Sequence, residues 1–264
     1  MLNSDFDATE PRLSRVGLDG IAVKPTECDV STVVDTVDAI TIDYEGRESI
    51  PDGETLRALA ERSELRLTTP VRADGYDPLG DDSLARSIPD GVGRVLVAGH
   101  PAYLDDQERR RAVAPRFGAA LETTTDAWVG TESVERIAMA TGAPQFELLS
   151  ASTERDVRAM RAAGFDGEIA IYAPTVLTDD GDEILDAVGG YVARRRAVAT
   201  ALPEGAATDS RAVGPARETL LEASADFALV GTDSAVSERV NSLRAAGAST
   251  IVGYPAAGIE QLLG

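Results

Sequence analysis

The stretch AWVGTESVERIAMATGAPQFELLSAS, residues 127–152, contains one complete unit of strand, helix and strand. Residues 127–129 and 146–149 are short apolar runs, and SVERIAMATG (133–142) between them has the amphipathic spacing of a helix. A helix between two short strands is the usual connection between parallel strands. This stretch therefore predicts a parallel α/β fold, provided that the unit repeats along the chain.

The same alternation continues along the rest of the sequence. Further apolar, largely β-branched runs are predicted to form strands at 20–23, 39–42, 65–68, 94–97, 168–171 and 250–252. Amphipathic segments between them are predicted to form helices, including 53–62, 153–165, 182–202 and 234–248. Thr153 stands where a helix N-cap is expected, and Gly164 and Gly247 stand where helices are expected to end.

Eight strands that alternate with helices, without a hairpin signal, favour a (β/α)8 TIM barrel. The alternative is an open doubly wound sheet, which is less favoured because no GxGxxG turn follows the first strand. Residues 1–15 are polar and unpatterned, so we expect a flexible tail followed by a single barrel domain over 16–264. Residues 202–224 are interpreted as a connection with a short helix, before an extra apolar stretch at 227–230.

The chain of 264 residues has a formal net charge of -20 and a single lysine, Lys24. A nucleic-acid-binding protein needs a basic surface to neutralise phosphates, and an anionic membrane would repel this surface, so neither partner is expected. High acidity with arginine in place of lysine is typical of cytoplasmic proteins of salt-in halophiles, because molar salt shortens the Debye length to about 3 Å. We interpret the acidity as an adaptation to salt.

Cysteine, histidine and hydropathy restrict the function further. Cys28 is the only cysteine and His100 the only histidine, so neither an internal disulfide nor a metal site is expected. Cys28 is interpreted as a small, at least half-buried residue and not as a nucleophile. No apolar segment follows a basic amino-terminal region, and no run has the length of a membrane span. A cytoplasmic location is therefore expected.

Polar side chains follow each predicted strand. In a parallel barrel the carboxyl ends of the strands form the functional face. The residues at these ends are Lys24, Asp43, Tyr44, Glu45, Arg72, Asp74, His100, Tyr103, Thr131, Glu132, Ser150, Ser152, Tyr172 and Tyr254.

Three of these positions have both a functional and a structural interpretation. Lys24 could bind an anionic substrate or act as a Schiff-base amine, and alternatively it forms a salt bridge with Glu27 or Asp43. His100 could donate a proton to a bound ring, or it is an ordinary loop residue. The turn after residue 129 could present helix amides to a phosphate. Alternatively Thr131 or Ser133 only caps the helix, and Glu132 places a carboxylate where the phosphate would lie.

Several motifs in order resemble the luciferase-like flavin and deazaflavin oxidoreductases, in particular the methylene-tetrahydropterin reductase branch. AITIDYEG (39–46) resembles the strand that ends in Asp-His in this family, and LRLTTPVRADGYDPL (65–79) its strand with a glycine-rich turn. Residues 127–152, EIAIYAPTVLTDDGDEILDAVGGYVARR (168–195) and FALVGTDSAVSERVNSLRAAGASTIVGYP (227–255) resemble its later strand and helix units. The order and spacing cover residues 18–255.

The resemblance implies a compact luciferase-like (β/α)8 barrel with shortened insertions, which transfers a hydride with a deazaflavin of the coenzyme F420 type or with FMN. A small-molecule ligand and a homodimer are the implied partners. Asp43, His100 and Lys24 would then be catalytic, and the cofactor-binding residues would be Thr69, Pro70, Val71, Gly99, Gly130, Thr131, Ser133 and Ser150. The family also has a cis peptide after its third strand, for which Thr69–Pro70 is the candidate here.

The sequence departs from the family at several of these points. Tyr44 replaces the histidine that follows Asp43 in the deazaflavin enzymes, and the insertion after the fourth strand shrinks to residues 105–125. Two other functions therefore stay open. One is a degenerate, non-catalytic barrel that binds another ligand or a protein and has no cofactor, and the other is an unrelated barrel enzyme, such as a lyase that uses Lys24.

Overall fold

The computed structural model describes residues 11–264, and this part of the chain divides into two compact units. One unit comprises residues 20–147 and 160–171. The other comprises the described residues up to Asp19 together with 148–159 and 172–264. Most of the predicted site belongs to the first unit, which contains strands β1 to β6.

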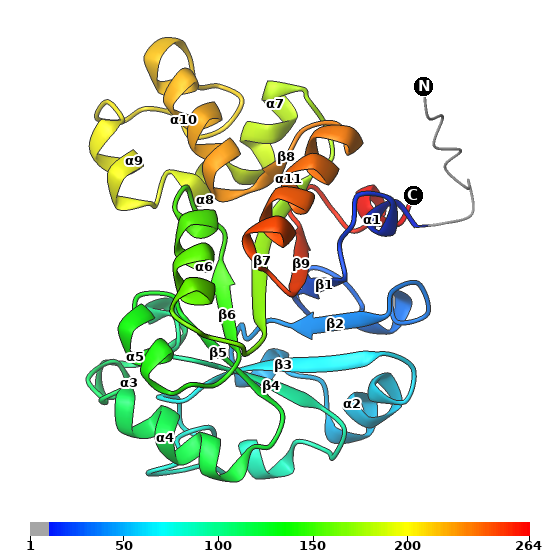
Figure 1. The fold of residues 1–264 in the computed structure, drawn as a ribbon, viewed down its shortest axis with the longest axis vertical. Helices are drawn as coiled ribbons and strands as arrows, with labels where there is room; N and C mark the ends of the chain where they lie inside the picture. The colour runs from blue at the N-terminus through cyan, green and yellow to red at the C-terminus, as the bar shows by residue number, and fades with distance from the viewer. Residues whose placement is uncertain (1–10) are drawn as a thin grey trace. The chain divides into compact units, whose positions relative to one another are not determined.

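The strands of the described residues lie close to the predicted runs (Figure 1). They are β1 (Gly20–Val23), β2 (Ala39–Ile42), β3 (Glu64–Pro70), β4 (Gly93–Val97), β5 (Ala127–Gly130), β6 (Gln145–Leu148), β7 (Ile169–Val176), β8 (Leu229–Val230) and β9 (Thr250–Pro255). The hydrogen-bonded order is β6-β5-β4-β3-β2-β1-β9-β7-β8, with an additional pairing of β6 with β7. Strands β1 to β7 and β9 thus close into a parallel (β/α)8 TIM barrel. The prediction is confirmed, and the open sheet is excluded.

The helices agree with the prediction in most positions. They are α1 (Arg12–Arg15), α2 (Gly53–Ala60), α3 (Asp106–Arg109), α4 (Ala114–Thr123), α5 (Glu135–Ala140), α6 (Thr153–Ala162), α7 (Gly181–Ile184), α8 (Gly190–Val192), α9 (Arg196–Ala201), α10 (Gly214–Phe227), α11 (Asp233–Ala246) and α12 (Glu260–Leu263). Helix α11 ends at Gly247 as expected, with a left-handed φ of 118°.

The predicted helix over 182–202 is broken in the structure. Helix α7, a π-helical turn at Leu185–Gly189 and α8 follow one another without a gap, and the break comes after Val192, where Arg195 is extended before α9. A Cβ atom at Gly189 would overlap the carbonyl oxygen of Thr208, so the close approach of this segment requires glycine. The connection that follows holds α10, which at 14 residues is longer than the expected short helix.

The expected tail is only partly described, because residues 1–10 lie outside the described residues. Residues Arg12–Arg15 form the short helix α1. Leu13 is 3% exposed, and Arg12 forms a salt bridge of 2.6 Å with Asp233 of α11. These residues differ from the expectation of a flexible tail because an apolar anchor and an ion pair fix them to the fold.

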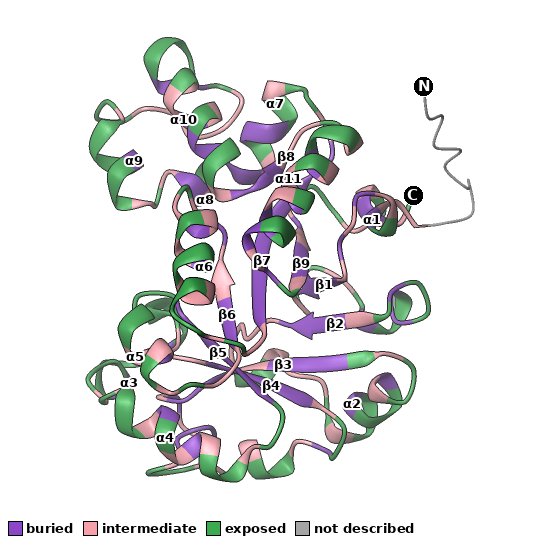
Figure 2. Cartoon of the chain, viewed as in Figure 1, coloured by how far each residue is buried: buried purple, intermediate pink, exposed green. Residues whose placement is uncertain are grey.

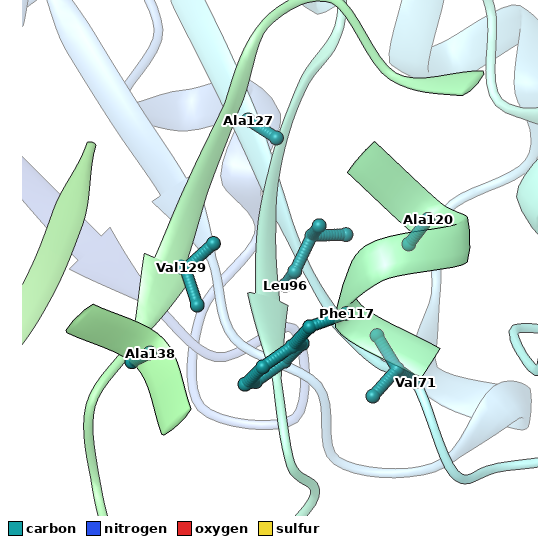
Figure 3. Packing of buried hydrophobic residues seen from close by; sticks show 7 residues of the cluster. All are labelled: Val71, Leu96, Phe117, Ala120, Ala127, Val129 and Ala138. Carbon is teal, nitrogen blue, oxygen red and sulfur yellow. The ribbon is translucent and has the colours of Figure 1, made fainter. Parts of the chain in front are cut away.

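Alternation along the strands separates two faces of the sheet in the first unit. Leu96 of β4 and Val129 of β5 pack against Phe117 of α4 and Ala138 of α5 (Figure 3). Their neighbours Val95 and Trp128, which are paired in register, therefore face the barrel interior. Figure 2 shows that the strands consist mainly of buried residues, while the helices keep exposed outer sides.

A buried arginine fills the interior near the amino ends of these strands. Arg66 of β3 is 7% exposed, and its guanidinium lies 3.9 Å from the centre of the Trp128 ring. It also forms salt bridges of 3.0 Å with Glu64 and Asp126. Trp128 in turn stacks on Phe146 at 5.6 Å. The side chains at the amino ends of the strands therefore fill and stabilise the barrel. In a parallel barrel the functional residues lie at the opposite, carboxyl ends.

We expect Arg66→Met to lower the free energy of unfolding by about 2 kcal/mol, because it removes a desolvated cation–π contact and two ion pairs whose carboxylates are largely exposed. Urea unfolding in molar salt measures the change. Arg62→Met is the matched control, since Arg62 pairs with Asp35 on the surface. Equal losses in both variants would show that the interior contact contributes nothing.

Candidate functional site

Three polar side chains line up on the interior face at the carboxyl ends of β1, β2 and β3. The amide of Asp43 donates to the carbonyl oxygen of Val23 at 2.8 Å, so Asp43 and Lys24 extend the β1–β2 register by one residue. The hydroxyl of Thr68 lies 3.3 Å from the carboxylate of Asp43. The ladder therefore sets an ammonium, a carboxylate and a hydroxyl side by side.

Lys24 also forms the salt bridge that the structural interpretation predicted. Its Nζ lies 2.9 Å from Oε1 of Glu27, and 27% of its side chain is exposed. The turn between them is closed by the amide of Glu27, which donates to the carbonyl oxygen of Lys24 at 2.9 Å. An ammonium held in this way supplies positive charge, whereas Schiff-base chemistry requires the neutral amine.

Aromatic rings from the loops after β2, β3 and β4 meet beside these polar groups. Tyr44 contacts Tyr76 and Tyr103 edge to face, with ring centres 5.7 and 6.2 Å apart. His100 lies 6.0 Å from Tyr103. Tyr103 is 41% exposed, whereas Tyr76 is 2% exposed. We call Tyr44, Tyr76, Tyr103 and His100 the aromatic group.

Burial keeps two phenols of the aromatic group protonated. It raises the pKa of Tyr76 to about 12, with a smaller upward contribution from Tyr44. Burial also raises the pKa of Tyr44, and the charge of Arg47 opposes that shift. Both hydroxyls are therefore neutral hydrogen-bond donors in any physiological buffer.

The ring of His100 has a defined tautomer. Its Nδ1 accepts a hydrogen bond of 3.2 Å from the amide of Ala102, at the start of the turn Pro101–Tyr103. An Nδ1 that accepts leaves the proton on Nε2 in the neutral ring. His100 thus presents an N–H donor from an exposed position.

Arginines tie the loops after β3 and β4 together. Arg72 donates to the carbonyl oxygens of Ala98 at 2.5 Å, Gly99 at 3.0 Å and Arg109 at 2.9 Å. Burial, followed by the nearby charge of Arg116, lowers the pKa of Arg72. Since all three guanidinium nitrogens bind main chain, this side chain positions the loop that holds His100.

Carboxylates complete the same loop network. Glu108 is 5% exposed and accepts from the amides of Asp74 and Asp105 at 2.7 and 2.8 Å. Arg111 pairs with Asp74 at 2.7 Å and with the buried Asp77 at 3.2 Å. The loops after β3 and β4 are thus fixed to each other by buried and partly buried charges.

The three residues predicted after β3 point in different directions. Thr69 is fully buried, and its hydroxyl accepts from Arg94 Nε at 3.2 Å. Val71 belongs to the cluster under α4 and α5, whereas Pro70 pairs with Val97 on the interior face. No peptide bond of the described residues is cis, so the cis bond implied at Thr69–Pro70 is not found.

The glycines of the predicted site permit close approaches. Gly99 has a φ of 92°, and a Cβ there would lie 3.0 Å from Leu104 and Pro70. A Cβ at Gly130 would lie 2.7 Å from Cγ1 of Val97. Both positions therefore require glycine for packing of the strand ends, whether or not a ligand binds there.

The turn after β5 differs in detail from a simple helix start. The amide of Thr131 donates to the carbonyl oxygen of Phe146 at 3.0 Å, and α5 begins only at Glu135. Ser133 has a φ of 62°, the only positive φ outside glycine among residues 11–264. Glu132 is exposed. Neither Thr131 nor Ser133 caps the helix, and Val134 stands at the N-cap without a side-chain bond.

Ser150 belongs to the other unit and was predicted to bind the cofactor. Its amide donates to Oγ1 of Thr153 at 2.9 Å, and its hydroxyl lies 3.2 Å from those of Ser152 and Thr153. The same unit holds Tyr172 of β7 and Tyr254 of β9, whose rings stack with centres 6.3 Å apart. Ser150 therefore organises the start of α6.

Sequence reasoning missed Thr68, Tyr76 and Arg94. Thr68 lies inside a strand, and only its place in the register beside Asp43 could have indicated it. Tyr76 is buried by contacts of the loop after β3 with other loops, and a local pattern carries no such information. Within residues 11–264 no cluster of histidine, cysteine or acidic residues could hold a metal ion, and no helix could cross a membrane.

Comparisons with known proteins agree with the fold. The model of a family of unknown function (DUF7388) matches residues 13–262. The structure is similar to an F420-dependent secondary alcohol dehydrogenase in complex with an F420-acetone adduct, with a TM-score of 0.55 and 13% identity over 90% of this chain and 94% of that one. It is also similar to apo-MsnO8, with a TM-score of 0.54 and 14% identity over 94% and 95% of the two chains. No curated protein matches the sequence.

Proposed function

The chain belongs to this family of unknown function, DUF7388, and from the geometry of its site we propose that it is a luciferase-like oxidoreductase. A deazaflavin or flavin ring would bind at the carboxyl ends of β1 to β4, and a hydride would pass between it and a small-molecule substrate. The observation that carries the proposal is the layer of Lys24, Asp43 and Thr68 next to the aromatic group. The similarity to an F420-dependent dehydrogenase supports the choice of cofactor.

The residues present suit the ring of such a cofactor. A deazaflavin or flavin ring is flat, with apolar faces and with carbonyl and N–H groups along one edge. Tyr103 offers an exposed aromatic surface, and Lys24 supplies a donor for a carbonyl group. Asp43 is an acceptor for the N–H. The cofactor would supply the hydride chemistry, and the protein would supply orientation and shielding from water.

The side chains of the site have separate roles in this proposal. The Thr68 hydroxyl orients the carboxylate of Asp43, which takes up or returns the proton that accompanies a hydride. His100 donates from Nε2 to a substrate oxygen, because its Nδ1 is held by Ala102. Tyr44 stays neutral and forms a wall of the site.

A second candidate is a non-catalytic barrel that binds another small ligand, and the turn after β5 favours it. The phosphate of a cofactor was predicted at Gly130 to Ser133, but the Thr131 amide is occupied and Glu132 adds a negative charge. The loop arginines 72, 111 and 116 are likewise engaged by carboxylates or main chain. The two candidates differ in whether a redox cofactor binds.

Binding of F420 and of FMN to the purified protein in molar salt tests the proposal. We expect binding of one cofactor at micromolar concentrations. Asp43→Ala should weaken it about tenfold, the cost of one hydrogen bond to a charged group. Asp90→Ala, at an exposed loop position, is the matched control and should bind like the unmodified protein. If neither cofactor binds, the oxidoreductase proposal is rejected and the non-catalytic ligand-binding barrel is the remaining candidate.

The homodimer and the position of the cofactor phosphate stay predictions. Sedimentation in molar salt, with and without cofactor, measures the first. For the second, Glu132→Gln should strengthen FMN binding if the phosphate lies at the turn after β5, because it removes a like charge. An unchanged affinity would place the phosphate elsewhere.

A further inference from the structure

Arg94 is a buried cation without a carboxylate partner. It is 8% exposed and lies on the helix-facing side of β4. Its Nε donates to the hydroxyl of Thr69 at 3.2 Å, and its Nη1 donates to the hydroxyl of Thr124 at 3.0 Å. No salt bridge to Arg94 occurs within residues 11–264. Both of its partners are uncharged.

The other buried arginine of this unit, Arg66, and the partly buried Arg111 and Arg116 are paired with carboxylates, whereas the partly buried Arg72 is compensated only by main-chain carbonyls. Arg66 has two carboxylates, and Arg111 and Arg116 share Asp77. An unpaired charge in the protein interior is costly, and a chain with 45 acidic residues has many carboxylates that could have paired with Arg94. Burial lowers the pKa of Arg94 to about 10, so the side chain still carries its charge at neutral pH.

The carboxyl end of α4 compensates only part of this charge. Thr124 follows the last residue of that helix, where the helix dipole favours a cation. Such an end acts as about half a negative charge, and no main-chain carbonyl of the described residues accepts from Arg94. The charge of Asp82 also acts on Arg94 from a distance, but no carboxylate of the described residues contacts the guanidinium.

The groups around Arg94 are mainly donors. A guanidinium has five N–H groups, of which the described acceptors use two. No nitrogen of Arg94 is both buried and unbonded, so the remaining N–H groups are open to solvent, from which an anion can approach. The hydroxyl of Thr124 accepts from Arg94 and keeps its own proton for another acceptor. The protonated phenol of Tyr76 lies within electrostatic reach of the same charge. This local surplus of donors lacks an acceptor with negative charge.

We propose that Arg94, together with the hydroxyl of Thr124, binds a small monovalent anion of the size of chloride. A halide ion is spherical, so it accepts hydrogen bonds from any direction and requires only donors around it. A dianion such as sulfate fits less well, because Asp82 lies within electrostatic reach and repels a second charge more strongly. Asp82 is itself paired with Arg86 at 2.7 Å and does not replace the anion. This site is independent of the proposed cofactor.

Thermal unfolding at one constant molar ionic strength tests the proposal, with sodium chloride, sodium gluconate and sodium sulfate as the three salts. We expect chloride to raise the midpoint of the unmodified protein about 5 °C above that in gluconate, since a bound ligand stabilises the folded state. Arg94→Met should lose this increment. Arg155→Met removes an arginine that is 78% exposed and paired with Asp156, and it should keep the increment. Equal increments in all three proteins would overturn the site, and an equal or larger sulfate increment that needs Arg94 would overturn the monovalent assignment.

A second measurement covers the case in which Arg94→Met does not fold. Thr124→Val keeps the guanidinium and removes one donor, so its chloride increment should fall by about half. Crystals of the unmodified protein grown in bromide should show an anomalous peak within hydrogen-bond distance of the Arg94 guanidinium. A full chloride increment in Thr124→Val together with no bromide peak at Arg94 would overturn the proposal.

Discussion

Asp77→Ala is expected to lower the free energy of unfolding by about 3 to 5 kcal/mol. The side chain of Asp77 is 2% exposed and lies between two arginines. Arg116 Nη2 donates to its Oδ2 at 2.9 Å, and Arg111 Nη1 lies 3.2 Å from the same oxygen. Arg116 Nε is also 2.9 Å from Oδ1, although its N–H is not aligned for a hydrogen bond.

The loss of stability is expected to be large because Asp77→Ala leaves buried groups without their partner. Removal of the carboxylate leaves Arg116 without an ion pair among the described residues, although its side chain is only 14% exposed. The amide of Leu79, which donates to Asp77 Oδ1 at 2.9 Å, also loses its acceptor. Loss of one partner of a buried pair costs far more than the pair contributes in net stability, because the remaining charge stays desolvated.

Urea unfolding in molar salt measures the change, and two variants define its cause. Asp77→Asn keeps the volume and one acceptor oxygen, so it should lose less than Asp77→Ala. Asp106→Ala removes a carboxylate that is 80% exposed and paired with Arg109, and it should change stability little. If Asp77→Ala lowered the free energy of unfolding no more than Asp106→Ala, the prediction would be wrong. Water would then have to reach the two arginines and replace the carboxylate.

The strands were predictable because their signal is local. Each barrel strand is a short apolar run, and the closed ring needs only eight of them in alternation with helices. The helix over 182–202 was predicted as unbroken, whereas it leaves the helical conformation after Val192, with Arg195 extended before α9, and its π-turn packs Gly189 against Thr208 outside the helix. Local periodicity carries no information on such a contact.

The residues of the candidate site also differ in whether a local sequence signal indicated them. Lys24 and Asp43 were predictable because they directly follow strands, and His100 because it comes three residues after β4, and parallel strands bring their carboxyl ends together. Thr69 was placed in the site by resemblance, but the strand register directs it to the helix side, where it binds Arg94. Arg72 was noted at a strand end, but nothing in the sequence indicates that it holds the loops together, since its three acceptors are main-chain carbonyls of other segments.

Transfer from molar salt to dilute buffer is expected to lower the midpoint of thermal unfolding by about 10 °C or more. Two salt effects with opposite signs compete here. Salt weakens ion pairs, and it also screens the mutual repulsion that a net charge of -20 produces in the compact state. Most ion pairs here have at least one largely exposed partner, such as Arg155 with Asp156, and exposed pairs contribute about 0 to 1 kcal/mol each.

The repulsion should therefore dominate, because it acts among all the uncompensated carboxylates, while the pairs act singly. Midpoints measured in sodium gluconate of increasing concentration isolate this screening from the chloride effect proposed at Arg94. Arg94→Met should keep the whole gluconate dependence and lose only the chloride increment. A midpoint that falls as gluconate is added would mean that the ion-pair networks around Asp77 and Glu154 outweigh the net charge.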